Sequence, residues 1–307
     1  MNFLDSCFSI LVLMCLAIPG YVLVKLKVLK EEHIFPLVTV LLYVNQPFIT
    51  INSFITKEFT SGLMINITIV FFLAALTQIV MFLVARLIFS YDKIPSRRNM
   101  YVFATAVGNV GFIGIPICNI FMPGNTEATL YISVYLIAFN LIAWTLGIYM
   151  VTGDKKYISL KKAVINPPVI ALIIALPLFF FKVKLPDIVV DCVGYMAIMN
   201  TPLAMVVLGM RFALVRFRDM FKGASVYLVS FLKLVVTPLI VYLVLLPFKL
   251  DKILVMTMVI VSAMPTANMV LMMAEKFGGD TEAAAKSIMN TTVFSILILP
   301  LVMLLPM

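Results

Sequence analysis

The chain carries ten apolar stretches, each close to the length that crosses a lipid bilayer. A spanning helix needs about 20 mostly apolar residues. Apolar residues make up 63% of the 307-residue chain and charged residues only 12%, which leaves too little polar surface for a soluble globule. We therefore predict an all-α polytopic membrane protein with ten transmembrane helices. The predicted spans cover residues 4–24, 34–56, 62–90, 98–121, 126–151, 163–181, 188–210, 222–248, 252–274 and 283–306.

Basic residues gather in alternate loops between these stretches. Odd-numbered loops hold seventeen Lys and Arg residues and even-numbered loops hold five. Such a bias places the richer loops in the cytoplasm, so we predict a multi-pass plasma (inner) membrane protein with both termini outside. The net charge of +9 then reflects sidedness, and nucleic acid is not a predicted partner. The seventeen are Lys25, Lys27, Lys30, Arg86, Lys93, Arg97, Arg98, Lys155, Lys156, Lys161, Lys162, Arg211, Arg216, Arg218, Lys222, Lys276 and Lys286.

Three pairs of similar segments recur at nearly one spacing, which indicates an internal duplication. Half of ten spans is an odd number, so the two copies would insert in opposite senses. We predict an N-terminal five-helix repeat over 1–153 and an inverted repeat over 154–307, together forming one transporter domain. Inverted repeats are typical of secondary transporters, whose solute sites lie on broken helices near the bilayer midplane. The matches are 17–27 with 175–184, Asn45-Gln46-Pro47 with Asn200-Thr201-Pro202, and Asn140 with Asn290.

The fourth and ninth predicted spans contain residues that disfavour a continuous helix. In an interior position Gly costs about 1 kcal/mol and Pro about 3 kcal/mol relative to Ala. Backbone groups freed in a membrane need protein or a water-lined cavity to satisfy them. We therefore predict two broken helices, and Pro265 follows Gly108 at the repeat spacing. The residues are Gly108, Asn109, Gly111 and Pro116 in the fourth span and Pro265, Thr266 and Asn268 in the ninth.

Two broken helices at matched positions of inverted repeats should cross near the midplane. Their half-helix N-termini favour an anion, and their free carbonyls suit a proton, a water molecule or a sodium ion. The side chains of Asn109, Thr266 and Asn268 would add neutral hydrogen-bonding groups. This crossing is the predicted substrate site.

Five further polar residues within the spans are candidates for the same site. Asn45 and Asn200 either line the solute path or cap a proline kink. Asn140 and Asn290 either face the crossing or bond neighbouring helices. Lys233 lies near the middle of the eighth span, where a cation is costly and marks a functional site by default. It would bind a substrate carboxylate, unless its long side chain reaches the membrane surface.

Chemistry other than solute binding has little support in the sequence. The only histidine, His33, lies in a loop, and no Asp or Glu lies deep in a predicted span. We therefore predict no enzymatic activity, no metal site and no cofactor. Coupling to a proton or to sodium stays open, as does uncoupled transport.

Three motifs resemble signatures of the auxin efflux carrier family. They are Gly108-Asn-Val-Gly-Phe-Ile-Gly-Ile-Pro116, Thr201-Pro-Leu-Ala-Met-Val-Val-Leu-Gly209 and Ala263-Met-Pro-Thr-Ala267. The similarity covers essentially the whole chain and is closest to prokaryotic members. It implies two inverted five-helix repeats, crossing fourth and ninth helices, and elevator-type alternating access, as in the related bile acid and arsenite carriers.

These features predict a secondary or facilitative transporter of a small organic anion. The substrate would be a mono- or dicarboxylate such as malate or malonate, or an auxin-like carboxylate. One alternative is a sodium-coupled carrier of larger amphipathic anions, similar to bile acid carriers. The other alternative is a membrane receptor that transports no solute. The sequence leaves open whether a second copy of the chain is a partner in a homodimer.

Overall fold

The computed structural model describes residues 3–214 and 221–305, and these residues are almost entirely helical. They form no β-strand, only one isolated bridge between Gly108 and Thr266. The predicted all-α class is confirmed. Two arginines counted for sidedness, Arg216 and Arg218, lie outside the described residues.

Seven helical stretches are long and apolar enough to cross a membrane. Three shorter apolar helices, Leu11–Lys25, Val110–Phe121 and Lys252–Ser262, fall within the remaining predicted spans. Two of these are halves of interrupted spans, which is why their length falls short. The count of ten spans and the inverted repeat stay predictions. The seven are Glu31–Ile55, Ser61–Tyr91, Thr126–Thr152, Lys155–Phe180, Asp187–Leu214, Ala224–Phe248 and Thr281–Val302.

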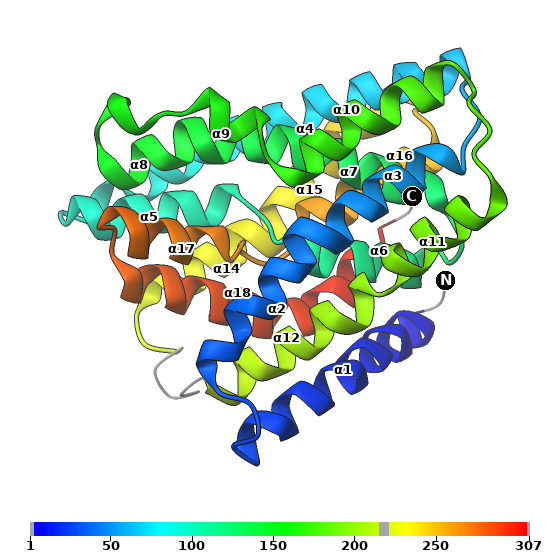
Figure 1. The fold of residues 1–307 in the computed structure, drawn as a ribbon. Coiled ribbons are helices and arrows are strands. Elements are labelled where there is room, and N and C mark those ends of the chain that lie inside the picture. The colour runs from blue at the N-terminus through cyan, green and yellow to red at the C-terminus, as the bar shows by residue number, and fades with distance from the viewer. Residues whose placement is uncertain (1–2, 215–220, 306–307) are drawn as a thin grey trace. The chain divides into compact units, whose positions relative to one another are not determined.

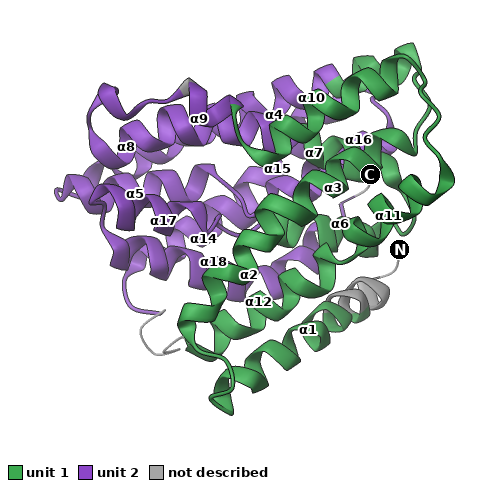
Figure 2. Cartoon of the chain, viewed as in Figure 1, with its two compact units in different colours: residues 1–67, 111–134, 165–215 green, residues 68–110, 135–164, 216–307 purple. Residues whose placement is uncertain are grey.

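The helices divide into two compact units, and each unit draws on both halves of the sequence (Figure 2). Unit 1 comprises residues 1–67, 111–134 and 165–215, and unit 2 comprises residues 68–110, 135–164 and 216–307. Helices α4 (Ser61–Ile88) and α7 (Thr126–Ile142) each begin in unit 1 and end in unit 2. The predicted repeats 1–153 and 154–307 are a division of the sequence, and they stay a prediction.

Unit 1 is organised by close packing of its first helix on its last, visible as neighbouring blue and yellow-green helices in Figure 1. A Cβ added to Gly20 would collide with the Val206 carbonyl, and one added to Gly209 would collide with that of Ala17. Small residues thus allow the two backbones to touch. The helices of unit 1 are α1 (Phe3–Lys25), α2 (Ile34–Val40), α3 (Gln46–Ile55), α6 (Ile115–Phe121), α10 (Pro167–Phe180), α11 (Asp187–Ile198) and α12 (Asn200–Leu214).

Unit 2 is built around the C-terminal helix, which packs against helices from both halves of the sequence. Helix α18 contacts α5, α14, α16 and α17, and most of its buried residues are small or polar, including Ser287, Asn290 and Thr291. The helices of unit 2 are α5 (Pro95–Ala106), α8 (Ile148–Thr152), α9 (Leu160–Val164), α14 (Ala224–Phe231), α15 (Thr237–Leu245), α16 (Lys252–Ser262), α17 (Met269–Phe277) and α18 (Thr281–Val302).

Proline residues explain the positions of several π-helical segments. Proline has no backbone N–H and its ring clashes with the carbonyl four residues earlier, and a π-helical turn relieves that clash. Three π-helical segments, Leu41–Asn45, Val110–Gly114 and Leu232–Val236, end two residues before Pro47, Pro116 and Pro238. A fourth, Ala143–Gly147, has no such proline.

Side-chain caps and glycines set several helix ends. The side chains of Asn166, Asp251 and Asp280 accept hydrogen bonds from backbone N–H groups three residues ahead, which satisfies donors that the first helical turn leaves free. Gly153 and Gly278 end α8 and α17 with left-handed φ values of 68° and 81°, which glycine adopts without strain. Local sequence therefore determines these ends.

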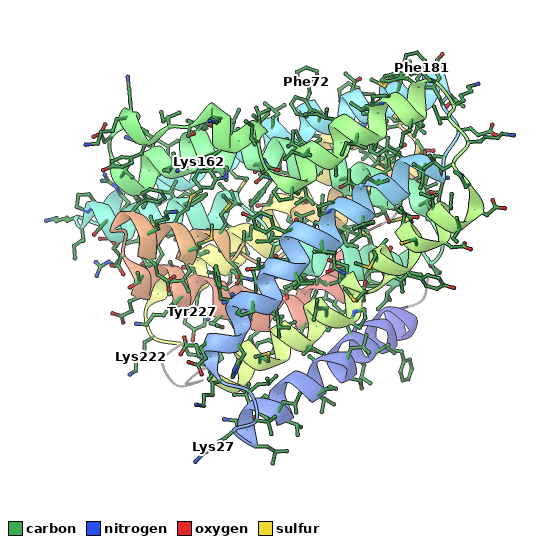
Figure 3. The ribbon with its side chains drawn as sticks, viewed as in Figure 1. Lys27, Phe72, Lys162, Phe181, Lys222 and Tyr227 are labelled. Atoms are coloured by element: carbon green, nitrogen blue, oxygen red, sulfur yellow. The ribbon has the colours of Figure 1, made fainter. Side chains whose placement is uncertain are left out.

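Large apolar side chains cover the outside of both units. Phe72 and Phe181 point away from the helices (Figure 3), with 65% and 80% of their surface exposed. Exposed apolar surface on this scale is typical of a lipid-facing protein. The polar interior described next contrasts with this apolar exterior.

Candidate functional site

The candidate site lies in unit 2, where two interrupted helices meet. Helix α5 ends at Ala106, and the chain is extended at Val107 before a π-helical segment begins at Val110. Helix α16 ends at Ser262, and α17 begins only at Met269. The two gaps pair in an antiparallel bridge between Gly108 and Thr266. Two broken segments 158 residues apart in the sequence therefore share one location.

Backbone hydrogen bonds hold the two gaps together. The N–H of Asn109 donates to the Pro265 carbonyl at 2.7 Å, and the N–H of Ala267 donates to the Val107 carbonyl at 3.3 Å. In a membrane interior a backbone group left without a partner costs several kcal/mol. Mutual pairing of the two gaps removes that cost for both.

Thr266 links this bridge to two neighbouring helices. Its hydroxyl donates to the carbonyl of Ala104 in the last turn of α5, at 2.9 Å. Its backbone N–H donates to the hydroxyl of Thr291 on α18, at 3.0 Å. Thr266 and Thr291 are both fully buried, so these bonds lie out of contact with water and define the position of the bridge.

Lys233 places a side-chain amino group against the same bridge. It lies in the π-helical segment Leu232–Val236 and only 1% of its surface is exposed. A Cβ added to Gly108 would lie 3.2 Å from Lys233 Nζ and 3.3 Å from the Met264 carbonyl oxygen. No carboxylate among the described residues forms an ion pair with Lys233. The side chain therefore packs at the crossing and does not extend to the end of its helix.

A buried hydrogen bond positions the turn before Lys233. The hydroxyl of Ser230 donates to Oδ1 of Asn290 on α18 at 2.5 Å, and both residues are buried. Ser230 precedes Lys233 by three residues and so lies on the same helix face. Asn290 thus holds the turn of α14 that comes directly before Lys233.

The other candidate residues of unit 2 differ in burial and in whether their side chains have hydrogen-bond partners. Asn109 is 8% exposed, and its side chain has no hydrogen-bond partner in the described part of the chain. Asn268 is half-buried immediately before α17. The Asn140 amide donates to the Leu136 carbonyl of its own helix at 2.7 Å. Asn109 is therefore the amide best placed to meet a solute.

Four candidates belong to unit 1 and not to the unit that holds the bridge. Gly111 and Pro116 follow the break, and α6 packs against α1 and α12. Asn45 and Asn200 are fully buried within unit 1. Pairing of these four with the crossing stays a prediction.

Gln78 is a buried polar residue that our sequence reasoning missed. It precedes Lys233 by 155 residues, the spacing that relates Asn45 to Asn200, and this offset was the available signal. Its Nε2 donates to the Ala74 carbonyl at 3.0 Å, and its Oε1 is buried without a partner among the described residues. Ring contacts of Phe82 with Phe103 and of Phe89 with Tyr101 place the chain that follows Gln78 against α5.

These groups together are suited to binding an anion. The crossing offers an amino group, a free carboxamide and backbone groups, all of which hydrogen-bond or attract an anion. Among the described residues no group of three His, Cys, Asp or Glu side chains is placed to hold a metal ion.

Comparison with known proteins places the chain among membrane transporters. The sequence profile of a family described as "Membrane transport protein" matches residues 5–159 and 156–303. An uncharacterized transporter from Methanocaldococcus jannaschii is 26% identical over 302 residues, which is 95% of this chain and 96% of the relative. The matches extend over both units.

Proposed function

The chain belongs to the membrane transport protein family, and we propose that it is a secondary carrier of a small organic anion. The solute site is the crossing in unit 2, and the substrate is a mono- or dicarboxylate such as malate or malonate, or an auxin-like carboxylate. The proposal is compatible with coupling to an ion gradient and also with facilitated transport.

The observation that carries the proposal is the position of Lys233. A cation buried inside a membrane protein is expensive unless an opposite charge compensates it. No carboxylate within the described residues does so, and the amino group lies against the broken segment at Gly108. A carboxylate of the solute supplies the missing charge at that place.

Neighbouring groups complete the recognition of an anion. The carboxamide of Asn109 has no partner in the described part of the chain and donates through its NH₂ group. Helix α17 begins at Met269, directly after the bridge, so the first backbone N–H groups of α17 lie next to the site and add partial positive charge. A lysine amino group with several neutral donors suits a small solute that carries one or two carboxylates.

The division of the chain supports an elevator mechanism. Every residue that forms the bridge, together with Lys233 and Asn290, belongs to unit 2. We propose that unit 2 carries the site across the membrane as one body and that unit 1 is the scaffold. The moving body then takes residues from both halves of the sequence.

The first experiment measures solute-induced currents in proteoliposomes. The purified chain is challenged with malate, malonate, succinate, lactate, indole acetate and taurocholate, each with and without proton and sodium gradients. We expect a saturable current with at least one small carboxylate. Asn109→Ala should abolish it, because that variant removes the free carboxamide. Lys233→Met should lower kcat/KM about 100-fold, which corresponds to about 3 kcal/mol for removing one partner of a buried charge pair.

Controls separate site effects from folding effects. Lys252 is exposed at the start of α16, so Lys252→Met removes a lysine without touching the crossing and should retain the current. Each variant must keep the parent chain's monodispersity and Tm. Near-normal uptake by folded Asn109→Ala and Lys233→Met would overturn this site. Currents seen only with taurocholate and sodium would favour a carrier of larger amphipathic anions.

A further inference from the structure

Unit 1 contains two buried carboxamides whose polar atoms are mostly without partners. Asn45 and Asn200 are each 0% exposed. Among the described residues, Oδ1 of Asn45 and both Oδ1 and Nδ2 of Asn200 have no hydrogen-bond partner. Leaving such a group unsatisfied destabilises the folded state, and buried polar groups in folded proteins are normally bonded. Two neighbouring amides in this state point to a bound polar ligand.

The two amides lie close together on packed helices. Nδ2 of Asn45 donates to the carbonyl of Met196 at 3.0 Å, which also fixes which atom of that amide is the oxygen. Asn200 follows Met196 by one helical turn, about 6 Å along the axis. The segment Leu41–Asn45 packs against both α11 and α12. Asn45 and Asn200 therefore flank one location.

Proline supplies further oxygen atoms at the same level. Pro47 and Pro202 each follow one of the asparagines by two residues. Because proline has no N–H, it leaves an upstream carbonyl without its helical donor, and the affected carbonyls lie near Tyr43 and Ile198. Helix α11 ends at Ile198 and α12 begins at Asn200, and Met199 between them keeps a right-handed helical conformation. With these carbonyls, the acceptor oxygens at this place would outnumber the one unpartnered side-chain donor, Nδ2 of Asn200.

The charge of the surroundings restricts what the ligand is. The acidic residues of α11, Asp187 and Asp191, are exposed, and the unpartnered side-chain atoms inside are two neutral amide oxygens and one amide nitrogen. Such oxygens suit hard cations, and without a carboxylate they do not compensate a divalent charge. A monovalent alkali cation matches this set best.

We propose that Asn45 and Asn200, with carbonyls freed at Pro47 and Pro202, bind a monovalent alkali cation, with Na⁺ as the first ion to test. Both asparagines belong to unit 1, whereas the bridge belongs to unit 2. The inference goes beyond the proposed function, because it names an ion that the proposed carrier binds. Its test is ion binding in the absence of any anionic solute other than chloride, so it succeeds or fails independently of anion transport.

The test measures thermal stability of the purified full chain at constant ionic strength. NaCl is compared with choline chloride and with KCl, and ²²Na⁺ binding is measured in parallel. An ion that binds only the folded state raises Tm, and the rise grows with the concentration of the ion. We expect NaCl to raise Tm by several degrees relative to choline chloride. Asn200→Leu should remove that rise.

A second variant keeps the test decisive if Asn200→Leu misfolds. Asn200→Asp adds a carboxylate of nearly the same shape, so at neutral pH the sodium-dependent rise in Tm should increase at least twofold. The matched control is Gln78→Leu, which removes a buried amide with an unpartnered oxygen in unit 2 and should leave the sodium response unchanged. Equal Tm in NaCl and choline chloride, without ²²Na⁺ binding, would show that water alone satisfies these amides and would overturn the proposal. A sodium response that survives in folded Asn200→Asp and Asn200→Leu unchanged would also overturn it.

Discussion

Single residues determine how the broken segments of unit 2 are held. Thr266 is the clearest case, because its hydroxyl and its backbone N–H bond two different helices. Asn109 has the opposite character, since its N–H donates to the Pro265 carbonyl while its side chain has no partner among the residues that the structure describes. One residue therefore holds the bridge and the other is available to a solute.

We predict that Thr266→Val lowers both stability and transport. Valine has nearly the same shape as threonine but no hydroxyl, so the Ala104 carbonyl loses its 2.9 Å hydrogen bond while the backbone bond to Thr291 can persist. An unsatisfied buried carbonyl costs about 1–3 kcal/mol, which thermal or denaturant unfolding of the purified protein should detect. Thr266→Ser keeps the hydroxyl and should recover most of the loss. Equal destabilisation by both variants would contradict a role for the hydroxyl.

At the scale of elements, direct contact between two helix backbones holds unit 1 together. Helices α1 and α12 approach so closely that Gly20 and Gly209 each face a carbonyl of the other helix. In a membrane, helices associate through such close packing because lipid provides no hydrophobic driving force between them. The same small residues therefore form the main contact between the first and last helices of the unit.

We predict that Gly209→Ala strongly destabilises unit 1. The added methyl group would overlap the Ala17 carbonyl, and overpacking costs typically 1–3 kcal/mol because a backbone atom cannot turn aside as a side chain can. The expected result is a fall in Tm of several degrees and reduced yield of monodisperse protein. Gly62→Ala is the matched control, since a Cβ there meets nothing within 4 Å. An unchanged Tm for Gly209→Ala would mean that α1 and α12 can move apart without loss of folding free energy.

At the scale of the whole molecule, orientation in the membrane follows from charge. The bias of Lys and Arg toward odd-numbered loops predicts that residues 153–162 face the cytoplasm and that residues 182–186 face outside. Lys156 and Lys184 are both exposed, so each can be replaced by cysteine and labelled.

We predict that Lys184→Cys reacts with a membrane-impermeant maleimide in intact cells and that Lys156→Cys reacts only after permeabilisation. The two residues lie in adjacent predicted loops on opposite sides of one span, so they should give opposite results. The parent chain, with its own cysteines, measures the background of labelling. Labelling of both positions in intact cells would contradict the predicted number or direction of the spans.

The sequence determined the features that depend on local composition. Apolar length alone indicated the membrane class, and the all-helical structure agrees with it. Glycine, proline and asparagine within a few residues indicated breaks near Gly108 and Pro265, because these residues disfavour a helix wherever the chain runs. The structure interrupts its helices at both places.

Only the tertiary structure decided which polar groups meet and which have partners. A central lysine can extend to a membrane surface or pack inside, and the neighbours that place Lys233 beside Gly108 lie on other helices. The bond from Ser230 to Asn290 joins residues 60 positions apart, and the unpartnered atoms of Asn45 and Asn200 depend on which helices enclose them. Helix packing sets such contacts between distant residues, and no local preference of the chain encodes them.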